Sequence, residues 1–223
     1  YLEEGDWVVL TPTSHDVRNA NGDRVNRPRV KSAVNEGLIE RGEYDHFMLK
    51  EIHEQPESLA RSILPYIDQA TQTLNLGDVA DTMFAKADRA VAIACGTAYY
   101  AAHTAKYWFE QKAKLAFETD IASEFRYREP VLPQTGPAMF VSQSGETADT
   151  LAALRYCRQN GTPAVAVVNV PESSIAREAA AIVPTYAGPE IGVASTKAFT
   201  AQLSVLAVLA LNAAKARGHL LPG

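Results

Sequence analysis

The amino-acid sequence predicts an α/β fold in which helices cover both faces of a five-stranded parallel sheet. Short apolar segments alternate along the chain with patterns typical of helices. Within these segments the apolar residues follow one another without a polar partner at every second position. Continuous apolar strands of this kind are typical of parallel sheets that are buried on both faces. The pattern favours a flavodoxin-like, doubly wound sandwich, and such folds bind ligands at the carboxyl ends of their strands.

The elements of this sheet are expected in the second half of the chain. We expect strands at residues 89–95, 114–119, 137–142, 163–169 and 182–187. A helix rich in aromatic residues is expected at 98–112, a second one after Glu146, and a long apolar helix at about 196–216. Apolar spacing from Phe47 onward, interrupted near Pro56, predicts helices that lead into this domain.

The beginning of the chain has a different pattern. Residues 7–10 are expected to form an apolar strand, and the Asn21-Gly22 step between Val17 and Val25 is a strong signal for a β-hairpin. The chain opens on Tyr1 without an initiator methionine, so we interpret it as part of a longer protein. We expect three parts, namely the end of a preceding β-containing domain at 1–27, a linker at 28–45 and the main domain with its leading helices at 46–223.

Composition argues against several classes of protein. The 223 residues carry a net charge of -5, and Lys and Arg are scattered, which argues against nucleic-acid binding. No apolar run approaches the roughly 20 residues of a membrane span, and the acidic start is unlike a signal peptide. The two cysteines, Cys95 and Cys157, lack the spacing of a metal site. We therefore expect a cytoplasmic protein with reduced thiols, no membrane contact, no metal and no cofactor.

The most informative motif is the run at residues 141–150, between an expected strand and an expected helix. Ser142, Ser144 and Thr147 offer hydroxyl groups, and the start of the helix offers backbone N–H groups to an anion. The run holds no Lys or Arg, which favours a compact phosphate monoester over a Walker-type nucleotide loop. Helix capping alone remains an alternative for these residues. Glu146 must point away or be paired for a phosphate to bind here.

Two further turns fall on the same edge of the predicted sheet. Cys95-Gly96-Thr97 ends the first strand, and residues 188–197 follow the last one. Gly96 permits close approach of the backbone to a ligand, although an ordinary turn is equally open. Ser195 is either a sugar contact or an N-cap. The convergence of three such turns strengthens the prediction of a binding site.

Together, several stretches resemble the first sugar isomerase (SIS) domain of the glutamine–fructose-6-phosphate aminotransferase family. The stretches that carry the resemblance are residues 95–97, 122–128, 142–150 and 190–200. Residues 2–6 are similar to the closing strand region of that family's glutaminase domain, and 48–56 to the segment that opens its isomerase half. The resemblance implies that the hairpin at 1–27 is a remnant of a glutaminase domain.

The resemblance also implies an activity and its site. In the family, ammonia released from glutamine reaches a second site, where fructose 6-phosphate is converted to glucosamine 6-phosphate. The implied substrate-binding residues are Thr97, Ser142, Gln143, Ser144, Thr147, Val193, Ala194 and Ser195, with Cys95 and Gly96 as further residues that could line the site. Ala98 stands where relatives often have serine, which puts one hydroxyl contact in doubt.

No catalytic residue is assigned in this chain. The resemblance implies that the catalytic lysines, glutamate and histidine come from a second SIS domain or a neighbouring subunit. We therefore expect the chain to be inactive alone, to lack the glutaminase nucleophile, and to form a homodimer. Two alternatives stay open, namely a regulatory domain that senses a sugar phosphate and a sugar-phosphate isomerase or deglycase. The long helix at 196–216 is apolar nearly all round, so we expect another domain or subunit to cover part of it.

Overall fold

The computed structural model describes residues 2–29, 40–71, 73–76 and 82–220. The chain forms two compact units, residues 1–37 and residues 38–223. The boundary between them falls inside the predicted linker at 28–45, most of which (30–39) lies outside the described residues.

The first unit is built on an antiparallel pair, β1 (Trp7–Leu10) and β2 (His15–Arg18). The predicted Asn21-Gly22 hairpin between Val17 and Val25 is present, and a further turn ahead of it joins β1 to β2. Thr11 and Ser14 close that turn, where the Ser14 N–H donates to Thr11 Oγ1 at 2.9 Å. The Asn-Gly turn follows β2 and returns the chain, so that the Val25 N–H donates to the Val17 carbonyl at 2.9 Å.

The second unit contains the predicted five-stranded parallel sheet. Its strands are β5 (Arg89–Ala94), β6 (Ala116–Ile121), β7 (Ala138–Ser142), β8 (Ala164–Val168) and β9 (Ala181–Pro184). All neighbours pair in parallel in the order β6-β5-β7-β8-β9. The α/β prediction is therefore confirmed. The strand order is flavodoxin-like, because β6, the second strand along the chain, lies at the edge of the sheet and β5, the first, lies next to it in the interior.

All five strands differ from their predicted ranges by one to three residues at one or both ends, and two of these differences have a local reason. The second strand begins at Ala116 rather than at residue 114, because Lys114 adopts a left-handed backbone with φ of +50° after a helical turn. The last strand ends at Pro184 rather than at 187. Tyr186 has φ of +51°, which extended backbone does not allow.

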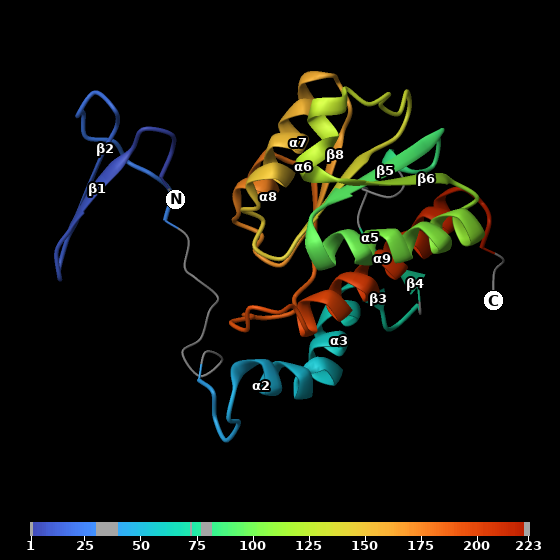
Figure 1. The fold of residues 1–223 in the computed structure, drawn as a ribbon, viewed down its shortest axis with the longest axis horizontal. Coiled ribbons are helices and arrows are strands. Elements are labelled where there is room, and N and C mark those ends of the chain that lie inside the picture. Colours follow the sequence, from blue (N-terminus) through green and yellow to red (C-terminus); the bar gives the residue numbers. More distant parts are fainter. Residues whose placement is uncertain (1, 30–39, 72, 77–81, 221–223) are drawn as a thin grey trace. The chain divides into compact units, whose positions relative to one another are not determined.

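Helices cover both faces of the sheet (Figure 1). One face carries α5 (Gly96–Trp108), its π-helical continuation η2 (Phe109–Ala113) and α9 (Lys197–Ala216). The other carries α6 (Ala122–Phe125), η3 (Arg126–Arg128), α7 (Ala148–Gln159) and α8 (Ser174–Glu178). Alternate residues of β5 enter the two cores, Ala92 on the α9 side and Ile93 on the α7 side, which is why the strand is apolar after Arg89.

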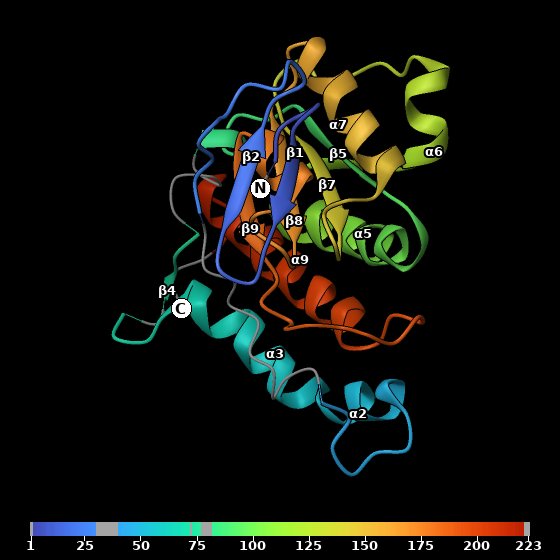
Figure 2. The same cartoon turned by 90° about the vertical axis from the view of Figure 1, so that its left-hand side faces the viewer.

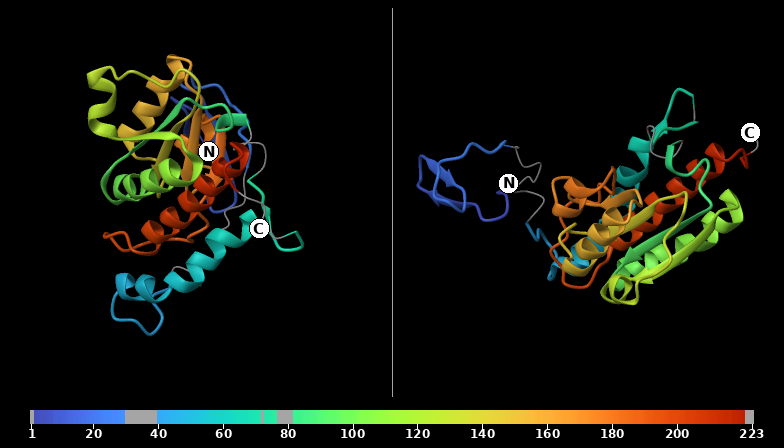
Figure 3. Two further views of the ribbon diagram at one scale, coloured as in Figure 1. Left: turned by 90° about the vertical axis from the view of Figure 1, so that its right-hand side faces the viewer. Right: turned by 90° about the horizontal axis from the view of Figure 1, so that it is seen from above.

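The leading segment lies against the outside of α9 (Figures 2 and 3). It consists of α2 (Phe47–His53), α3 (Gln55–Ile63), η1 (Leu64–Tyr66) and the short antiparallel pair β3 (Ile67–Asp68) and β4 (Thr73–Leu74). Ser58 of α3 is fully buried, and its hydroxyl donates to the Ala187 carbonyl at 3.3 Å. The leading helices are therefore part of the same packed unit as the sheet.

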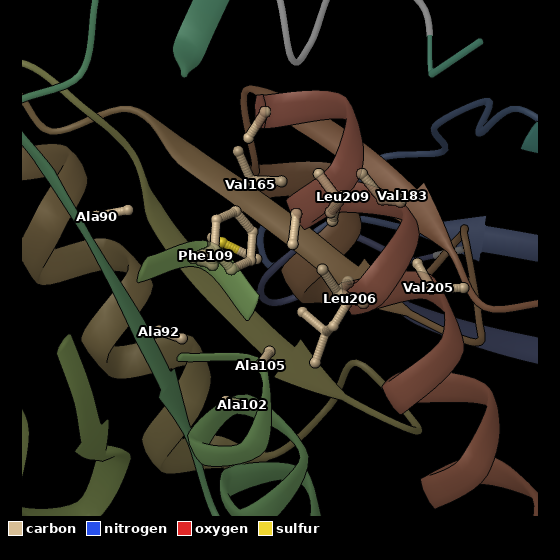
Figure 4. Close-up of a cluster of buried hydrophobic side chains, with 14 of the residues drawn as sticks. Ala90, Ala92, Ala102, Ala105, Phe109, Val165, Val183, Val205, Leu206 and Leu209 are labelled. Carbon is tan, nitrogen blue, oxygen red and sulfur yellow. The ribbon is translucent and has the colours of Figure 1, made fainter. Parts of the chain in front are cut away.

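The long helix α9 is covered mainly by its own unit. Val205, Leu206 and Leu209 pack beside the sheet and next to Ala102 and Ala105 of α5 (Figure 4). By length and apolarity α9 could cross a membrane, but 67% of its most apolar window is buried in this unit. α3, α5 and the sheet cover most of α9, while Leu211 is 37% exposed, so the expectation that another domain or subunit covers part of this helix stays a prediction.

Candidate functional site

A pocket of about 330 Å³ lies at the carboxyl edge of the sheet. Three corners of the chain and one helix line it: Cys95, Thr97 and Ala98 from the first corner, Val141, Ser142, Gln143, Ser144 and Thr147 from the second, Glu190, Gly192, Val193 and Ser195 from the third, and Gln202 from α9. A larger hollow of about 730 Å³ lies in the first unit. None of the predicted binding residues lines that hollow, so it does not bear on the predicted chemistry.

The structure brings most of the predicted site residues together. Eight of them line the pocket: Cys95, Thr97, Ser142, Gln143, Ser144, Thr147, Val193 and Ser195. Gly96 and Ala194 belong to the same corners but do not line it. Gly96 begins α5 with φ of +57°, a backbone conformation that glycine adopts readily. Parallel strands explain the convergence, since their carboxyl ends meet at one edge.

The second corner is a compact turn held by its own hydroxyl groups. Ser142 Oγ accepts a hydrogen bond from the Gly145 N–H at 3.0 Å and lies 3.0 Å from Thr147 Oγ1. Ser144 Oγ accepts from the Glu146 N–H at 3.2 Å. Two backbone N–H groups of the turn are thus already used. One hydroxyl of the Ser142–Thr147 pair donates to the other, so the hydrogen of the second and that of Ser144 can rotate toward an anion, because a hydroxyl donates and accepts at the same time.

Glu146 is paired away from the pocket. Its Oε1 accepts a hydrogen bond from the Ser174 N–H at 2.7 Å, at the start of α8. The condition that the Glu146 carboxylate be paired if a phosphate is to bind at this turn is therefore met. Gly145 makes the turn tight, because an added Cβ would lie 1.9 Å from Ser173 Oγ.

The third corner is held by Glu190. Its Oε1 accepts from the Thr196 N–H at 2.8 Å and the Ala198 N–H at 3.1 Å, the first amides of α9. The Ser195 hydroxyl donates to Glu190 Oε2 at 3.2 Å. The alternative that Ser195 is the N-cap of α9 is therefore wrong, since Glu190 performs that role from five residues upstream. A carboxylate at a helix N-terminus also has a favourable interaction with the helix dipole.

The charged side chain on the wall of the pocket is the carboxylate of Glu190, which accepts hydrogen bonds from backbone amides. Among the described residues that line the pocket, none is a lysine or arginine. Lys197 at the start of α9 is 2% exposed and pairs with Glu54. Burial acts to raise the pKa of Glu54, but the hydrogen bond and the charge of Lys197 outweigh it and lower that pKa. An anion in this pocket would therefore be stabilised by hydroxyl groups, amides and the N-termini of α5 and α7. Within the described ranges no cluster of His, Cys, Asp or Glu could hold a metal ion.

A family model for the SIS domain matches residues 83–212, which include all three corners. The chain belongs to the SIS domain family. This SIS domain chain is 55% identical over 220 residues to the glutamine–fructose-6-phosphate aminotransferase (isomerizing) of Bradyrhizobium diazoefficiens, covering 99% of this chain and 36% of that protein. It is also 55% identical over 218 residues to the enzyme of the same name from Brucella abortus, covering 98% and 36%.

Solved structures agree with this assignment. The C-terminal domain of glucosamine-fructose-6-phosphate aminotransferase from Francisella tularensis superimposes with a TM-score of 0.78 at 44% identity, covering 82% of this chain and 51% of that one. The SIS domain chain spans 36% of the length of the curated relatives named above.

One residue of the SIS pocket, Gln202, lies outside the three corners that the sequence analysis singled out. Gln202, in the second turn of α9, lines the pocket and is 2% exposed. Its Oε1 is buried without a hydrogen-bond partner among the described residues, as is Oε1 of Gln143. A glutamine inside an otherwise apolar helix was the available signal, but only the folded chain shows which face of α9 the pocket borders.

Proposed function

We propose that this chain is the first SIS domain of a glutamine–fructose-6-phosphate aminotransferase and that it binds fructose 6-phosphate. The observation that carries the proposal is the convergence of the three predicted corners on one pocket rich in hydroxyl groups and without a lysine or arginine among its described lining residues. The identity of 55% to relatives of that name supports the choice of substrate.

The proposed binding mode divides the pocket between phosphate and sugar. The second corner takes the phosphate through Ser142, Gln143, Ser144 and Thr147 and the N-terminus of α7, with Thr97 contributing from the first corner. The segment 193–195 at the third corner contacts the sugar through backbone carbonyls and the Ser195 hydroxyl. Ala98 lines the pocket with a methyl group and supplies no hydrogen bond there.

The whole protein would couple this pocket to ammonia from glutamine. Amination of fructose 6-phosphate at its carbonyl carbon and proton transfer between adjacent carbons need acid–base groups and a lysine. We propose that these groups come from a second SIS domain or a neighbouring subunit, as in the family, and that the enzyme is a cytoplasmic homodimer. The role of this chain is then to bind and orient the sugar phosphate.

The similarity favours this proposal over the two alternatives. The match to the aminotransferases covers 99% of this chain and thus extends well beyond residues 83–212 of the SIS match. A regulatory domain or a sugar-phosphate isomerase that shares only the SIS fold would not account for similarity in residues 1–45.

Thermal unfolding with and without fructose 6-phosphate tests the proposal. A ligand at ten times its Kd stabilises by about 1.4 kcal/mol, which raises the Tm of a domain of this size by roughly 3–5 °C. Ser144→Ala should reduce that rise, while Ser123→Ala, outside the pocket, should leave it intact. If millimolar fructose 6-phosphate leaves the Tm of the unaltered chain unchanged, the proposal fails.

A further inference from the structure

The segment at residues 48–56 has no role in the binding mode described so far, yet it touches the pocket wall. Glu51 of α2 is 2% exposed, and its carboxylate lies under the third corner. Glu51 Oε1 accepts hydrogen bonds from the Ile191 N–H at 2.6 Å and the Gly192 N–H at 3.0 Å. A residue 140 positions away in sequence therefore supplies the acceptor for two successive amides of this loop.

A second link from the same segment holds the other end of the corner. Glu54 caps the end of α2 and pairs with Lys197, the first residue of α9. Glu51 and Glu54 are separated by about one helical turn, so both carboxylates face the same loop. The segment 193–195, which we propose to contact the sugar, lies between these two attachment points.

The contact between α2 and the loop is close. A Cβ added at Gly192 would lie 2.5 Å from Glu51 Oε2 and 3.5 Å from Met48 Cα. The loop residues themselves provide little apolar packing, since Ile191 is 41% and Val193 fully exposed. The shape of the third corner thus depends on polar attachment to Glu51, Glu190 and the Glu54–Lys197 pair rather than on a core of its own.

We propose that Glu51 is a positioning residue for the sugar side of the pocket. By holding the Ile191 and Gly192 amides, it places the backbone at 193–195 at the distance that the sugar hydroxyl groups require. The second corner, which we assign to phosphate, has no contact with Glu51 among the described residues. Loss of Glu51 should therefore weaken recognition of the sugar and spare recognition of the phosphate. This inference rests on the proposed function, because it assumes that fructose 6-phosphate occupies the pocket.

The test is to titrate the chain separately with fructose 6-phosphate and with inorganic phosphate. In Glu51→Ala the affinity for fructose 6-phosphate should fall about tenfold, because sugar hydrogen bonds are misaligned, while that for inorganic phosphate stays within about twofold of the unaltered chain. Glu51→Gln keeps an acceptor of the same shape and should restore most of the affinity. Glu57→Gln is the matched control, since Glu57 lies on α3 with its side chain 74% exposed and away from the pocket.

Each outcome decides between the two proposals. If Glu51→Ala binds fructose 6-phosphate like the unaltered chain, or loses both ligands equally, the positioning role is overturned while the proposed function stands. If the unaltered chain binds neither ligand, the proposed function is overturned and the positioning role with it. Should Glu51→Ala not fold, Glu51→Gln takes its place. The expected result is then a smaller loss of affinity, for fructose 6-phosphate alone. An equal loss of affinity for both ligands would count against the inference.

Discussion

Gly145→Ala tests the tight packing of the second corner. Gly145 has φ of +67°, where an L-residue costs about 1–2 kcal/mol relative to glycine. Its new Cβ would also lie 1.9 Å from Ser173 Oγ and 2.4 Å from Ser173 Cβ, so the start of α8 must shift. Such overpacking costs a further ~1–3 kcal/mol. Together these terms give a loss of about 2–5 kcal/mol in the free energy of unfolding.

Gly161→Ala is the matched control within the same chain. Gly161 has φ of +79°, but its Cβ would meet nothing within 4 Å, so only the backbone cost of ~1–2 kcal/mol applies. At about 2–4 °C per kcal/mol, the excess of ~1–3 kcal/mol lowers the Tm of Gly145→Ala by roughly 2–12 °C more than that of the control.

Thermal unfolding followed by circular dichroism measures both variants. Ser173→Gly, introduced into Gly145→Ala, removes the overlapping atoms and should recover part of the loss in Tm. Equal Tm values for Gly145→Ala and Gly161→Ala would refute the argument from close approach. A fructose 6-phosphate response unchanged in Gly145→Ala would also contradict the assignment of phosphate to this turn.

Three other outcomes are expected. Burial raises the pKa of the Cys157 thiol to about 12, so at pH 8 a thiol reagent should label Cys95 in the native chain and label both cysteines only after denaturation. Fructose 6-phosphate should slow the labelling of Cys95, which lines the pocket. The hydrogen bond from Arg155 lowers the pKa of Glu178, so Glu178 stabilises the fold above its ordinary pKa of 4.5 and loses this effect as the pH falls. The loss in the free energy of unfolding caused by Glu178→Gln, measured by denaturant titration, should therefore be smaller in acid. Gln202→Leu removes a buried amide whose Oε1 has no partner among the described residues, so its Tm should equal or exceed that of the unaltered chain while its ligand-induced shift decreases.

Several features followed directly from the sequence. The apolar strand at Ala164–Val168 could be recognised because all its residues are buried, which makes the pattern independent of which face meets which helix. The corner at Ser142–Thr147 could be recognised because a strand, a turn rich in hydroxyl groups and a helix follow one another without interruption. The Asn21-Gly22 turn between Val17 and Val25 could be recognised for the same local reason, and the Val25 N–H donates to the Val17 carbonyl in the structure.

Other features depend on contacts between segments far apart in the chain. Glu51 and Gln202 lie in ordinary helical patterns, and nothing in their local sequence marks them as neighbours of the pocket. Glu51 was part of a recognised stretch, but its partners, the Ile191 and Gly192 amides, become visible only when α2 packs beside the third corner. The extent to which α3, α5 and the sheet cover α9 was equally decided by packing.

The sequence by itself determined the class of fold, the sheet edge at which the candidate pocket lies and most of the residues that line this pocket. These depend on patterns of apolar and polar residues that lie close together in the sequence. Only the tertiary structure decided which carboxylates hold the third corner, how Glu146 is paired and where Gln202 points. Those are hydrogen bonds and contacts between distant segments, and their geometry exists only after the helices have packed on the sheet.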